Sequence, residues 1–258
     1  MQTFLTSFAV VMTILFILWM IGTAFRDVSI VDPFWGAGFA IIGWITWWLN
    51  SPTHTRVLLL AILVSAWGLR LSLFLLWRNW GHGEDRRYAA MREQNRERFW
   101  WTSLFTVFLL QGILLWFVSL PIQVAAAKNS AIPLNWLDAA GILLWTIGFA
   151  FEAVGDWQLA RFKAEPTHAG KVMDRGLWRY TRHPNYFGDF CIWWGLYLIA
   201  TAGGAGWTFP GPLLMTILLM TVSGVSLLES TIKDRRPDYA SYCLRTNAFF
   251  PGPPKTLA

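Results

Sequence analysis

Long apolar runs separated by short polar segments make up most of the chain. A helical residue rises 1.5 Å, so about 20 apolar residues cross the hydrocarbon core of a bilayer. Seven runs approach or reach this length, and they predict seven transmembrane helices. The expected spans are 3–25, 33–49, 56–77, 99–120, 133–154, 186–201 and 208–228.

The composition supports a membrane protein. Hydrophobic residues make up 55% of the 258 positions and charged residues only 14%, against about 25% in soluble domains. The 18 Trp residues suit membrane interfaces, where amphipathic rings are stable. These values exclude a soluble enzyme, a disulfide scaffold and a disordered regulator. We therefore expect an all-α integral membrane protein.

The basic residues predict the orientation of the spans. Nearly all of the 21 Lys and Arg residues fall between runs three and four, between runs five and six, or in the tail. Cytoplasmic loops are enriched in these residues, so we expect the N-terminus outside and the C-terminus in the cytoplasm. No internal repeat or linker interrupts the chain, which predicts a single domain over 1–258.

Polar side chains recur at the cytoplasmic ends of the predicted spans. Glu152 and Asp156 end the fifth run, Asn185 and Asp189 begin the sixth, and Glu229 closes the seventh. Ionisable groups in a membrane are costly and indicate function. Beside so many cations, they can bind ribose hydroxyls and an amide while Arg and Lys neutralise phosphates. The alternative is that the carboxylates only pair with arginines of the loops.

The loop before the sixth run has the features of an anion site. Gly176 indicates a turn, and Pro184 breaks the chain before a helix begins at Asn185. Cations crowd beside the start of that helix, where anions bind favourably: Arg175, Arg179, Arg182 and His183. A polybasic segment that contacts acidic lipid headgroups is the alternative interpretation.

Several motifs resemble a known family. They are Thr181-Arg-His-Pro-Asn-Tyr-Phe-Gly188, Arg236-Pro-Asp-Tyr239, Thr246-Asn-Ala-Phe249-Phe-Pro251, Val31-Asp-Pro-Phe-Trp-Gly36 and Gly83-Glu-Asp-Arg-Arg-Tyr88. Together they are similar to the steroid 5-alpha-reductase C-terminal superfamily, and most closely to its bacterial DUF1295-like branch. The Arg-His-Pro-x-Tyr core also resembles isoprenylcysteine carboxyl methyltransferases and phospholipid methyltransferases.

The resemblance implies a seven-helix reductase that holds NADPH from the cytoplasmic side of a bacterial inner membrane. In this reading, 1–98 form the substrate and catalytic half, and 133–258 form the cofactor half. The Gln-Glu pair of those reductases is absent from the second span, so that feature is not carried over. The expected cofactor-binding residues are Glu152, Asp156, Arg161, Lys163, Arg175, Arg179, Tyr180, Arg182, His183, Asn185, Asp189, Arg236 and Tyr239.

A proton donor can be sought on physical grounds. Hydride addition to an enone places negative charge on the carbonyl oxygen, where an acidic group must stand. Tyr88 is a phenol beside two arginines, which we expect to favour the phenolate and lower its pKa. Asp32 and Glu84 are the acids that can orient it. The alternative for 84–87 is a solvated loop with local ion pairs.

These observations predict an NADPH-dependent reductase of a C=C bond conjugated to a carbonyl in a lipophilic, steroid-like substrate. The alternative enzyme is an S-adenosylmethionine-dependent methyltransferase acting on a lipid or a prenylcysteine. A transporter or lipid-binding protein ranks third, because no repeated halves are visible. We expect membrane lipid and the substrate as partners, with no metal, no nucleic acid and no obligate protein partner.

Overall fold

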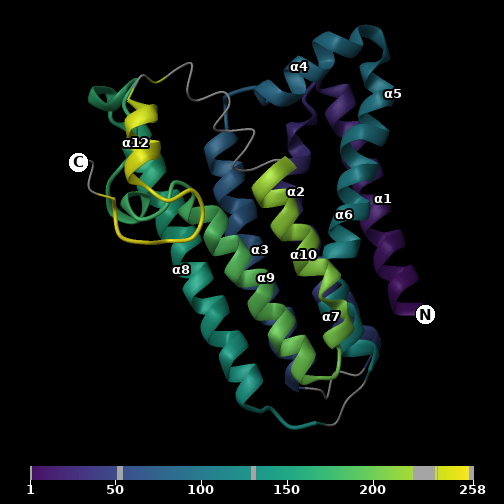
Figure 1. Ribbon diagram of the computed structural model, residues 1–258. Helices are drawn as coiled ribbons and strands as arrows, with labels where there is room; N and C mark the ends of the chain where they lie inside the picture. Colours follow the sequence, from purple (N-terminus) through teal and green to yellow (C-terminus); the bar gives the residue numbers. More distant parts are fainter. Residues whose placement is uncertain (1, 51–54, 129–131, 223–235, 237, 256–258) are drawn as a thin grey trace. The chain divides into compact units, whose positions relative to one another are not determined.

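The computed structural model describes residues 2–50, 55–128, 132–222, 236 and 238–255, and every regular element within them is helical (Figure 1). The first half contains α1 (Gln2–Ala24), α2 (Val31–Asn50), α3 (Thr55–Asn79), α4 (Arg86–Asn95), α5 (Phe99–Ser103), α6 (Leu110–Val118) and α7 (Leu120–Ala127). The second half contains α8 (Trp136–Ala164), α9 (Pro184–Ala202), α10 (Pro210–Ile217) and α12 (Tyr239–Arg245). Two π-helical segments, Leu104–Leu109 and Leu218–Val222, precede α6 and follow α10.

Five of these helical stretches are long and apolar enough to cross a membrane. They are Gln2–Ala24, Val28–Asn50, Thr55–Asn79, Arg86–Val118 and Trp136–Ala164. A shorter apolar helix covers Gly206–Thr221. These helices are consistent with a multi-pass membrane protein, as the sequence predicts. The count of seven spans and their orientation stay predictions.

Helix bounds differ from the apolar runs at α4, which lies in the expected connection before residue 99, and in two further places. The segment 121–132, expected as a connection, contains α7, because the chain breaks only briefly at Ser119 and Pro121 sits in the first turn of the next helix. The fifth run is part of α8, which continues ten residues past the expected end at 154 to Ala164. The last part of the seventh run, with Glu229, lies outside the described residues.

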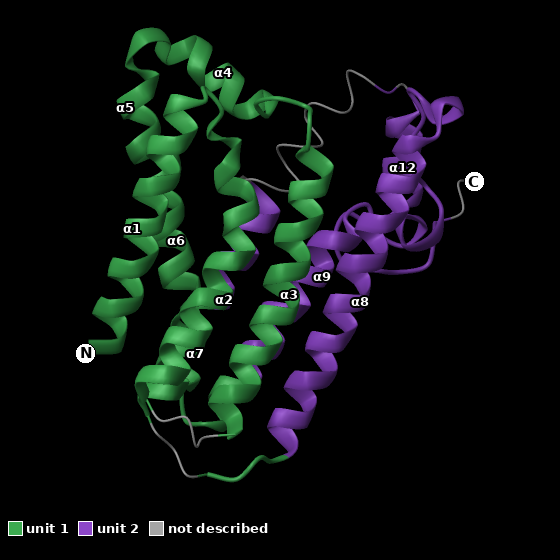
Figure 2. Cartoon of the chain, turned by 180° about the vertical axis from the view of Figure 1, so that it is seen from behind, with its two compact units in different colours: residues 1–135, 199–211 green, residues 136–198, 212–258 purple. Residues whose placement is uncertain are grey.

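The chain divides into two compact units (Figure 2). Unit 1 comprises Met1–Asn135 and Ile199–Gly211, and unit 2 comprises Trp136–Leu198 and Pro212–Ala258. The catalytic residues expected from the sequence fall in unit 1 and the expected cofactor-binding residues in unit 2. The prediction of a single domain remains a prediction.

In unit 1, α2 and α3 lie side by side along their length (Figure 2). Their backbones meet at Gly36 and Gly68, where a Cβ atom on either glycine would lie 2.2 Å from the carbonyl oxygen of the other. Small residues of this kind allow close helix packing in membranes. The Gly36-Ala-Gly38 sequence is therefore a packing feature of α2.

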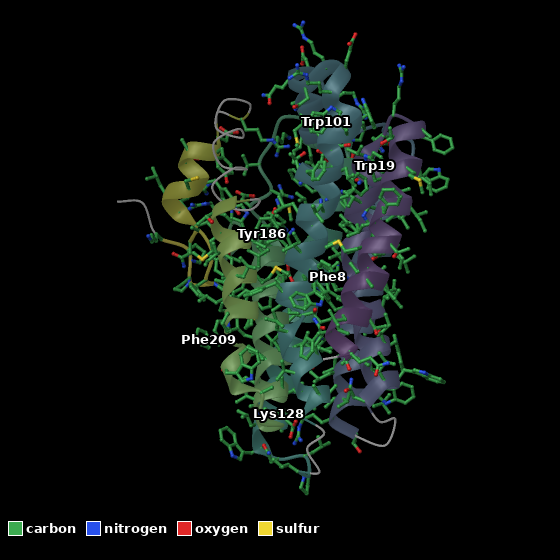
Figure 3. All side chains as sticks on the ribbon, turned by 90° about the vertical axis from the view of Figure 1, so that its right-hand side faces the viewer. Phe8, Trp19, Trp101, Lys128, Tyr186 and Phe209 are labelled. Atoms are coloured by element: carbon green, nitrogen blue, oxygen red, sulfur yellow. The ribbon has the colours of Figure 1, made fainter. Side chains whose placement is uncertain are left out.

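Aromatic side chains of α1 and α5 gather at one end of unit 1. Trp19 of α1 donates a hydrogen bond of 2.8 Å from its indole to the carbonyl oxygen of Trp100, and their rings stack. Figure 3 shows Trp19 and Trp101 toward the same end of the unit, with Phe8 farther along α1. Amphipathic rings at one level of apolar helices are typical of a membrane interface.

In unit 2, α8 and α9 also approach through glycines. A Cβ atom on Gly188 would lie 2.5 Å from the carbonyl oxygen of Gly148, and one on Gly195 would lie 2.7 Å from that of Gly141. Because the helices touch at this distance, polar groups on their facing sides come together. The same unit contains α12 and the segment after it, coloured yellow in Figure 1.

Candidate functional site

The centre of the candidate site in unit 1 is the hydroxyl group of Tyr88. This hydroxyl donates a hydrogen bond of 2.6 Å to Oδ1 of Asp32, at the start of α2. The amide of Gln111, on α6, donates to the same phenolic oxygen over 3.1 Å. Tyr88 itself is only 6% exposed. Two helices, α2 and α6, therefore hold the phenol of α4 by its donor and its acceptor sites.

Arg87 binds the second oxygen of Asp32. Its Nη2 lies 2.6 Å from Oδ2 of Asp32, and its Nε lies 2.9 Å from Oδ1 of Asp85. Asp85 also caps α4 by accepting a hydrogen bond from the backbone N–H of Arg87. Asp32 thus has a cation on one oxygen and a phenol on the other.

Glu84 does not contact Tyr88 and instead fixes the loop that leads to it. Its carboxylate makes a bidentate pair with Arg92, with both distances 2.8 Å, and accepts a bond of 3.1 Å from the N–H of Val28. The N–H of Asp85 donates to the hydroxyl of Ser29 over 2.7 Å. These bonds attach the 84–92 segment to the segment before α2. Glu84 therefore holds the loop in place without touching the phenol. The local ion pairs of the alternative interpretation are present as well, between Arg87 and Asp85 and between Arg92 and Glu84.

The lowered pKa that we expect for Tyr88 stays a prediction. Tyr88 lies near the beginning of the stretch Arg86–Val118, which is long and apolar enough to cross a membrane. Arg87 directs its charge at Asp32 and Asp85 rather than at the phenol oxygen. The Tyr88 hydroxyl itself donates to Asp32.

The carboxyl groups of Glu84 and Asp85, in the loop before α4, have lowered pKa values. Burial would raise the pKa of Glu84, but the hydrogen bonds from Arg92 and Val28 prevail and lower it. The pKa of Asp85 is likewise lowered, because bonds from the side chain and backbone of Arg87 outweigh its burial. Both carboxylates are thus ionised partners that hold the loop in place.

In unit 2, α8 and α9 bring buried polar side chains together. Glu152 and Asp156 are 3% and 6% exposed, and both face inward from α8. The amide nitrogen of Asn185, at the start of α9, donates to Oδ1 of Asp156 over 3.2 Å. Asp189, one turn further along α9, is half-buried. Asp156 and Asn185, both expected near the cytoplasmic ends of their spans, are thus in contact.

The loop between α8 and α9 packs back against α8, six to nine residues before that helix ends. The indole of Trp178 donates to the carbonyl oxygen of Gly155 over 3.0 Å, and the N–H of Leu177 donates to the amide oxygen of Gln158. Gly176 has φ of 58°, and a Cβ there would lie 2.4 Å from Gln158. The turn expected at Gly176 is therefore present, and only glycine fits it.

Arg182, expected among the phosphate ligands, binds backbone carbonyl groups of the C-terminal segment. Its Nη1 lies 3.2 Å from the oxygen of Cys243 and 2.7 Å from that of Thr246. Its own N–H donates to the carbonyl oxygen of Asn247 over 2.9 Å. These contacts give Arg182 a structural role, which its charge alone did not reveal.

The other expected cofactor residues have varied environments. His183 is buried and stacks on Tyr186 with ring centroids 5.5 Å apart, while Tyr180 is exposed. Arg236 donates to the carbonyl oxygen of Lys171, and Tyr239 is buried against Tyr242. Arg161 lies over the ring of Trp157, and Lys163 follows it at an exposed position on α8.

A basic cavity of about 630 Å³ lies between the loop before α9 and the C-terminal segment of unit 2. Four cations and one carboxylate contribute to its wall: Arg175, Arg179, Arg245, Lys255 and Asp174. The sequence predicts Arg175 and Arg179 for an anion site. Arg245 and Lys255 were missed, because nothing in the sequence shows that the tail returns to this loop.

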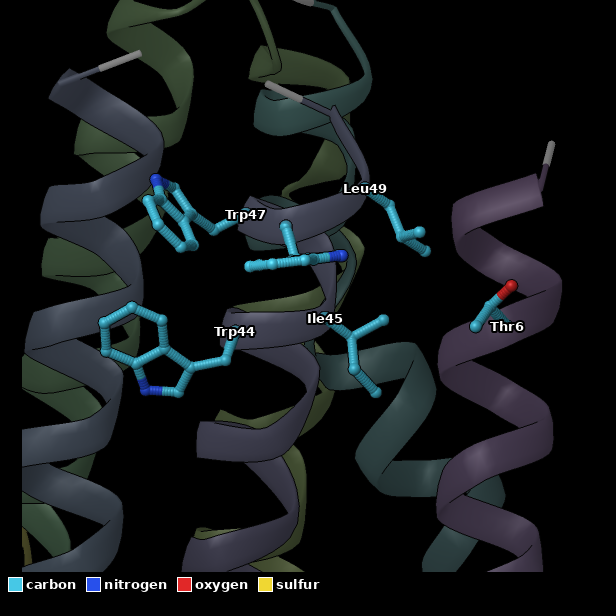
Figure 4. A pocket seen from close by; sticks show the side chains of 6 residues that line it. Thr6, Trp44, Ile45, Trp47 and Leu49 are labelled. Carbon is cyan, nitrogen blue, oxygen red and sulfur yellow. The ribbon is translucent and has the colours of Figure 1, made fainter. Parts of the chain in front are cut away.

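An apolar pocket of about 440 Å³ lies elsewhere in unit 1, lined by Thr6 of α1 and by the last residues of α2 (Figure 4). Figure 4 shows the side chains of Trp44 and Ile45 among those that line it. Trp44 is 12 residues beyond Asp32 on the same helix, which corresponds to about 18 Å. This pocket is therefore separate from the Tyr88 group. Among the described residues, no group of His, Cys, Asp and Glu is arranged to hold a metal ion.

Comparison with known proteins shows the family. Residues 18–246 match the family described as a protein of unknown function (DUF1295), and the chain belongs to this family. It is also 23% identical to an uncharacterized protein of Schizosaccharomyces pombe over 91% of this chain and 76% of that protein. No solved structure matches.

Proposed function

We propose that the protein is a membrane-embedded, NADPH-dependent reductase of a C=C bond conjugated to a carbonyl group in a lipophilic, steroid-like substrate. The observation that supports it most is the Tyr88 hydroxyl, buried and held by Asp32 and Gln111. A buried neutral phenol is a suitable partner for a carbonyl oxygen that gains negative charge. The resemblance to steroid 5-alpha-reductases supplies the reaction class.

The residues of unit 2 fit NADPH by their chemistry. Asp156 and Asn185 offer acceptor and donor atoms of the kind that bind ribose hydroxyls and a carboxamide, and both sit at the facing ends of α8 and α9. Arg175 and Arg179 line a cavity with a net positive charge, which suits phosphates. When bound, NADPH supplies the hydride. Arg182 is not among its ligands in this proposal, because its guanidinium holds the tail.

In unit 1, each residue has a separate task. The Tyr88 hydroxyl would turn from Asp32 to the carbonyl oxygen of the substrate and donate its proton there, and the phenolate that is left would take a proton back from water. Gln111 fixes the phenolic oxygen from the other side. Asp32 orients the phenol, while the guanidinium of Arg87 pairs with the second oxygen of the Asp32 carboxylate. Glu84 acts at a distance by holding Arg92 and the loop. The Asp32–Tyr88 pair would take the place of the Gln-Glu pair of the reductases that the chain resembles.

The membrane setting follows from the same reading. We propose seven spans with the N-terminus outside and the reactive groups at the cytoplasmic face of a bacterial inner membrane. The distribution of Lys and Arg supports this orientation. The substrate would enter laterally from the bilayer, because the wall of the protein is apolar.

A methyltransferase that uses S-adenosylmethionine is the second candidate, since the Arg-His-Pro-x-Tyr core is shared with such enzymes. S-adenosylmethionine contains no phosphate, so it gives the four cations of the basic cavity no task. The charge of that cavity therefore favours NADPH.

Ligand-induced thermal stabilisation of the purified protein in detergent tests the proposal. A ligand that binds the native state raises the melting temperature. At a ligand concentration a hundredfold above Kd, it adds about 2.7 kcal/mol to the free energy of unfolding. We expect NADPH to stabilise the protein and S-adenosylmethionine to leave it unchanged. Stabilisation by S-adenosylmethionine alone would reject the reductase. Oxidation of NADPH with membrane-soluble enones, followed at 340 nm (roughly the absorbance band of the reduced nicotinamide), then identifies the substrate class.

A further inference from the structure

The basic cavity of unit 2 has an unbalanced charge. Arg175, Arg179, Arg245 and Lys255 line it, against the single carboxylate of Asp174. Arg245 lies 3.8 Å from Asp174, which neutralises at most one of the four cations. Cations held together around a hollow repel one another unless an anion joins them. The cavity therefore suits a ligand with several negative charges.

The C-terminal side of this cavity is held in place by the fold. The N–H of Lys255 donates to the carbonyl oxygen of Arg245 over 2.8 Å, so the two cationic residues are tied together. Tyr242, which is 2% exposed, donates from its hydroxyl to the carbonyl oxygen of Trp178. The bonds from Arg182 secure the same segment. Arg245 and Lys255 thus extend from a fixed backbone.

A second cavity, of about 320 Å³, adjoins the first, because Arg175 and Gly176 line both. Its wall includes Trp157, whose side chain is 57% exposed, with the guanidinium of Arg161 5.5 Å from the ring centre. A Trp face beside a guanidinium is a favourable surface for a flat aromatic base. A cationic hollow next to an aromatic one matches the two halves of a nucleotide.

We infer that the two cavities together bind the adenosine phosphate half of the dinucleotide. The base lies at Trp157, and Arg245 and Lys255 bind the 2′-phosphate that distinguishes NADPH from NADH. This inference rests on the proposed function and adds to it the residues that choose between the two cofactors. It assigns a binding role to Arg245 and Lys255, which no motif of the sequence indicates.

Isothermal titration of the purified full-length protein in detergent tests this inference with 2′,5′-ADP and 5′-AMP as probes. The two probes share adenosine and the 5′-phosphate, so their difference reports the 2′-phosphate. We expect 2′,5′-ADP to bind at least about tenfold more tightly, since a charge-assisted hydrogen bond contributes that much. Arg245→Gln and Lys255→Gln should each lower its affinity about tenfold and leave that of 5′-AMP within about twofold.

Two further variants serve as controls. Lys171→Gln removes an exposed cation of unit 2 that does not line the cavity, and it should change neither affinity. Trp157→Ala should lower the affinity for both probes by the same factor, because it removes the surface on which the base lies. If Arg245→Gln does not fold, Arg245→Lys keeps the charge and should retain most of the preference for 2′,5′-ADP.

The phosphate monoester of a lipid headgroup has the same chemistry, so vesicles of phosphatidic acid and phosphatidylcholine form a second arm. Binding to phosphatidic acid without binding to 2′,5′-ADP would overturn the inference. Equal affinity for the two nucleotides, or unchanged affinity in both glutamine variants, would overturn it as well. If NADPH still stabilises those variants as it does the wild type, the proposed reductase stands without this inference. If no nucleotide binds at all, both fail.

Discussion

The hydroxyl of Tyr88 lies 2.6 Å from the carboxylate of Asp32, although 56 residues separate them in the chain. The distance is short because Glu84 and Asp85 attach the loop before α4 to the segment before α2, through Val28 and Ser29. The phenol is thus placed by contacts that lie outside the reacting groups. Loss of the loop contacts should therefore displace the Tyr88 hydroxyl from Asp32, although both reacting groups remain in the chain.

Removing the hydroxyl of Tyr88 should stop turnover. Tyr88→Phe keeps the ring but leaves no proton donor, and general acid catalysis contributes about 10²–10⁴-fold to a rate. We expect kcat to fall by at least about a hundredfold. The Kd of NADPH should stay within about twofold, because the proposed cofactor groups lie in unit 2. Stopped-flow oxidation of NADPH and a binding titration measure the two effects.

Tyr197→Phe makes the same chemical change on α9, where the ring packs against Trp194, and should leave kcat unchanged. Full turnover in Tyr88→Phe would remove this residue as the donor while leaving the proposed cofactor unaffected.

Neutralising Glu84 should destabilise the protein. Glu84→Gln loses the bidentate pair with Arg92 and weakens the bond from Val28. Hydrogen bonds to charged groups contribute about 1.5–3 kcal/mol each, so we expect a loss of about 1–3 kcal/mol after partial exposure of Arg92 is considered. Thermal unfolding in detergent measures it. Glu93→Gln, at an exposed position of α4, should change stability by less than about 0.5 kcal/mol.

The same pair predicts a dependence of stability on acid. The pKa of Glu84 in the folded protein lies below its ordinary value of 4.5, so its ionised form is favoured by folding. The stability it adds is complete above pH 4.5 and is lost as the pH falls through the lowered value. Melting curves at successively lower pH should therefore bring wild type and Glu84→Gln together. A difference that stays constant in acid would contradict the assignment.

Arg182 and Arg179 should separate structure from binding. Arg182→Ala leaves the carbonyl oxygens of Cys243 and Thr246 without their donor, so it should lower stability by about 1–3 kcal/mol. Arg179→Ala, at an exposed position lining the basic cavity, should leave the melting temperature nearly unchanged and lower the affinity for NADPH. Thermal unfolding and titration of both variants decide this. The reverse pattern would restore Arg182 to the phosphate ligands.

Close helix contact in unit 1 gives a prediction that does not depend on function. Gly68→Ala places a Cβ atom 2.2 Å from the carbonyl oxygen of Gly36, and neither backbone can yield cheaply. Overpacking of this kind costs about 1–3 kcal/mol or more. The melting temperature should drop, whereas Gly206→Ala, where the nearest atom is 3.5 Å away, should be tolerated.

Local patterns predict what depends on neighbours along the chain. The apolar runs locate the long helices because a membrane helix must be apolar over its whole length. The spacing of Glu152 and Asp156 places both on one face of α8, and the structure shows both buried. The Gly176 turn was likewise predictable, since its conformation is a local property.

Contacts between distant segments were harder to predict. The sequence indicates Asp32 and Glu84 as equal candidates to orient Tyr88, and only the fold shows that Asp32 does so. Adjacency in sequence suggests that Arg87 acts on the Tyr88 phenol, but the fold directs its guanidinium at Asp32 and Asp85. Gln111 was missed, although a lone amide within an apolar run was an available signal.

The π-helical turns at Leu104–Leu109 end two residues before Gln111, which donates a hydrogen bond to Tyr88. Such turns contain more residues than α-helical ones, so they rotate all that follows relative to all that precedes. Excising one residue there would restore ordinary winding and swing the Gln111 amide by about 100° around the helix axis. The π-helical segment therefore sets which side of α6 faces Tyr88. A variant shortened there would keep its helix, but the Gln111 amide would point away from the phenol.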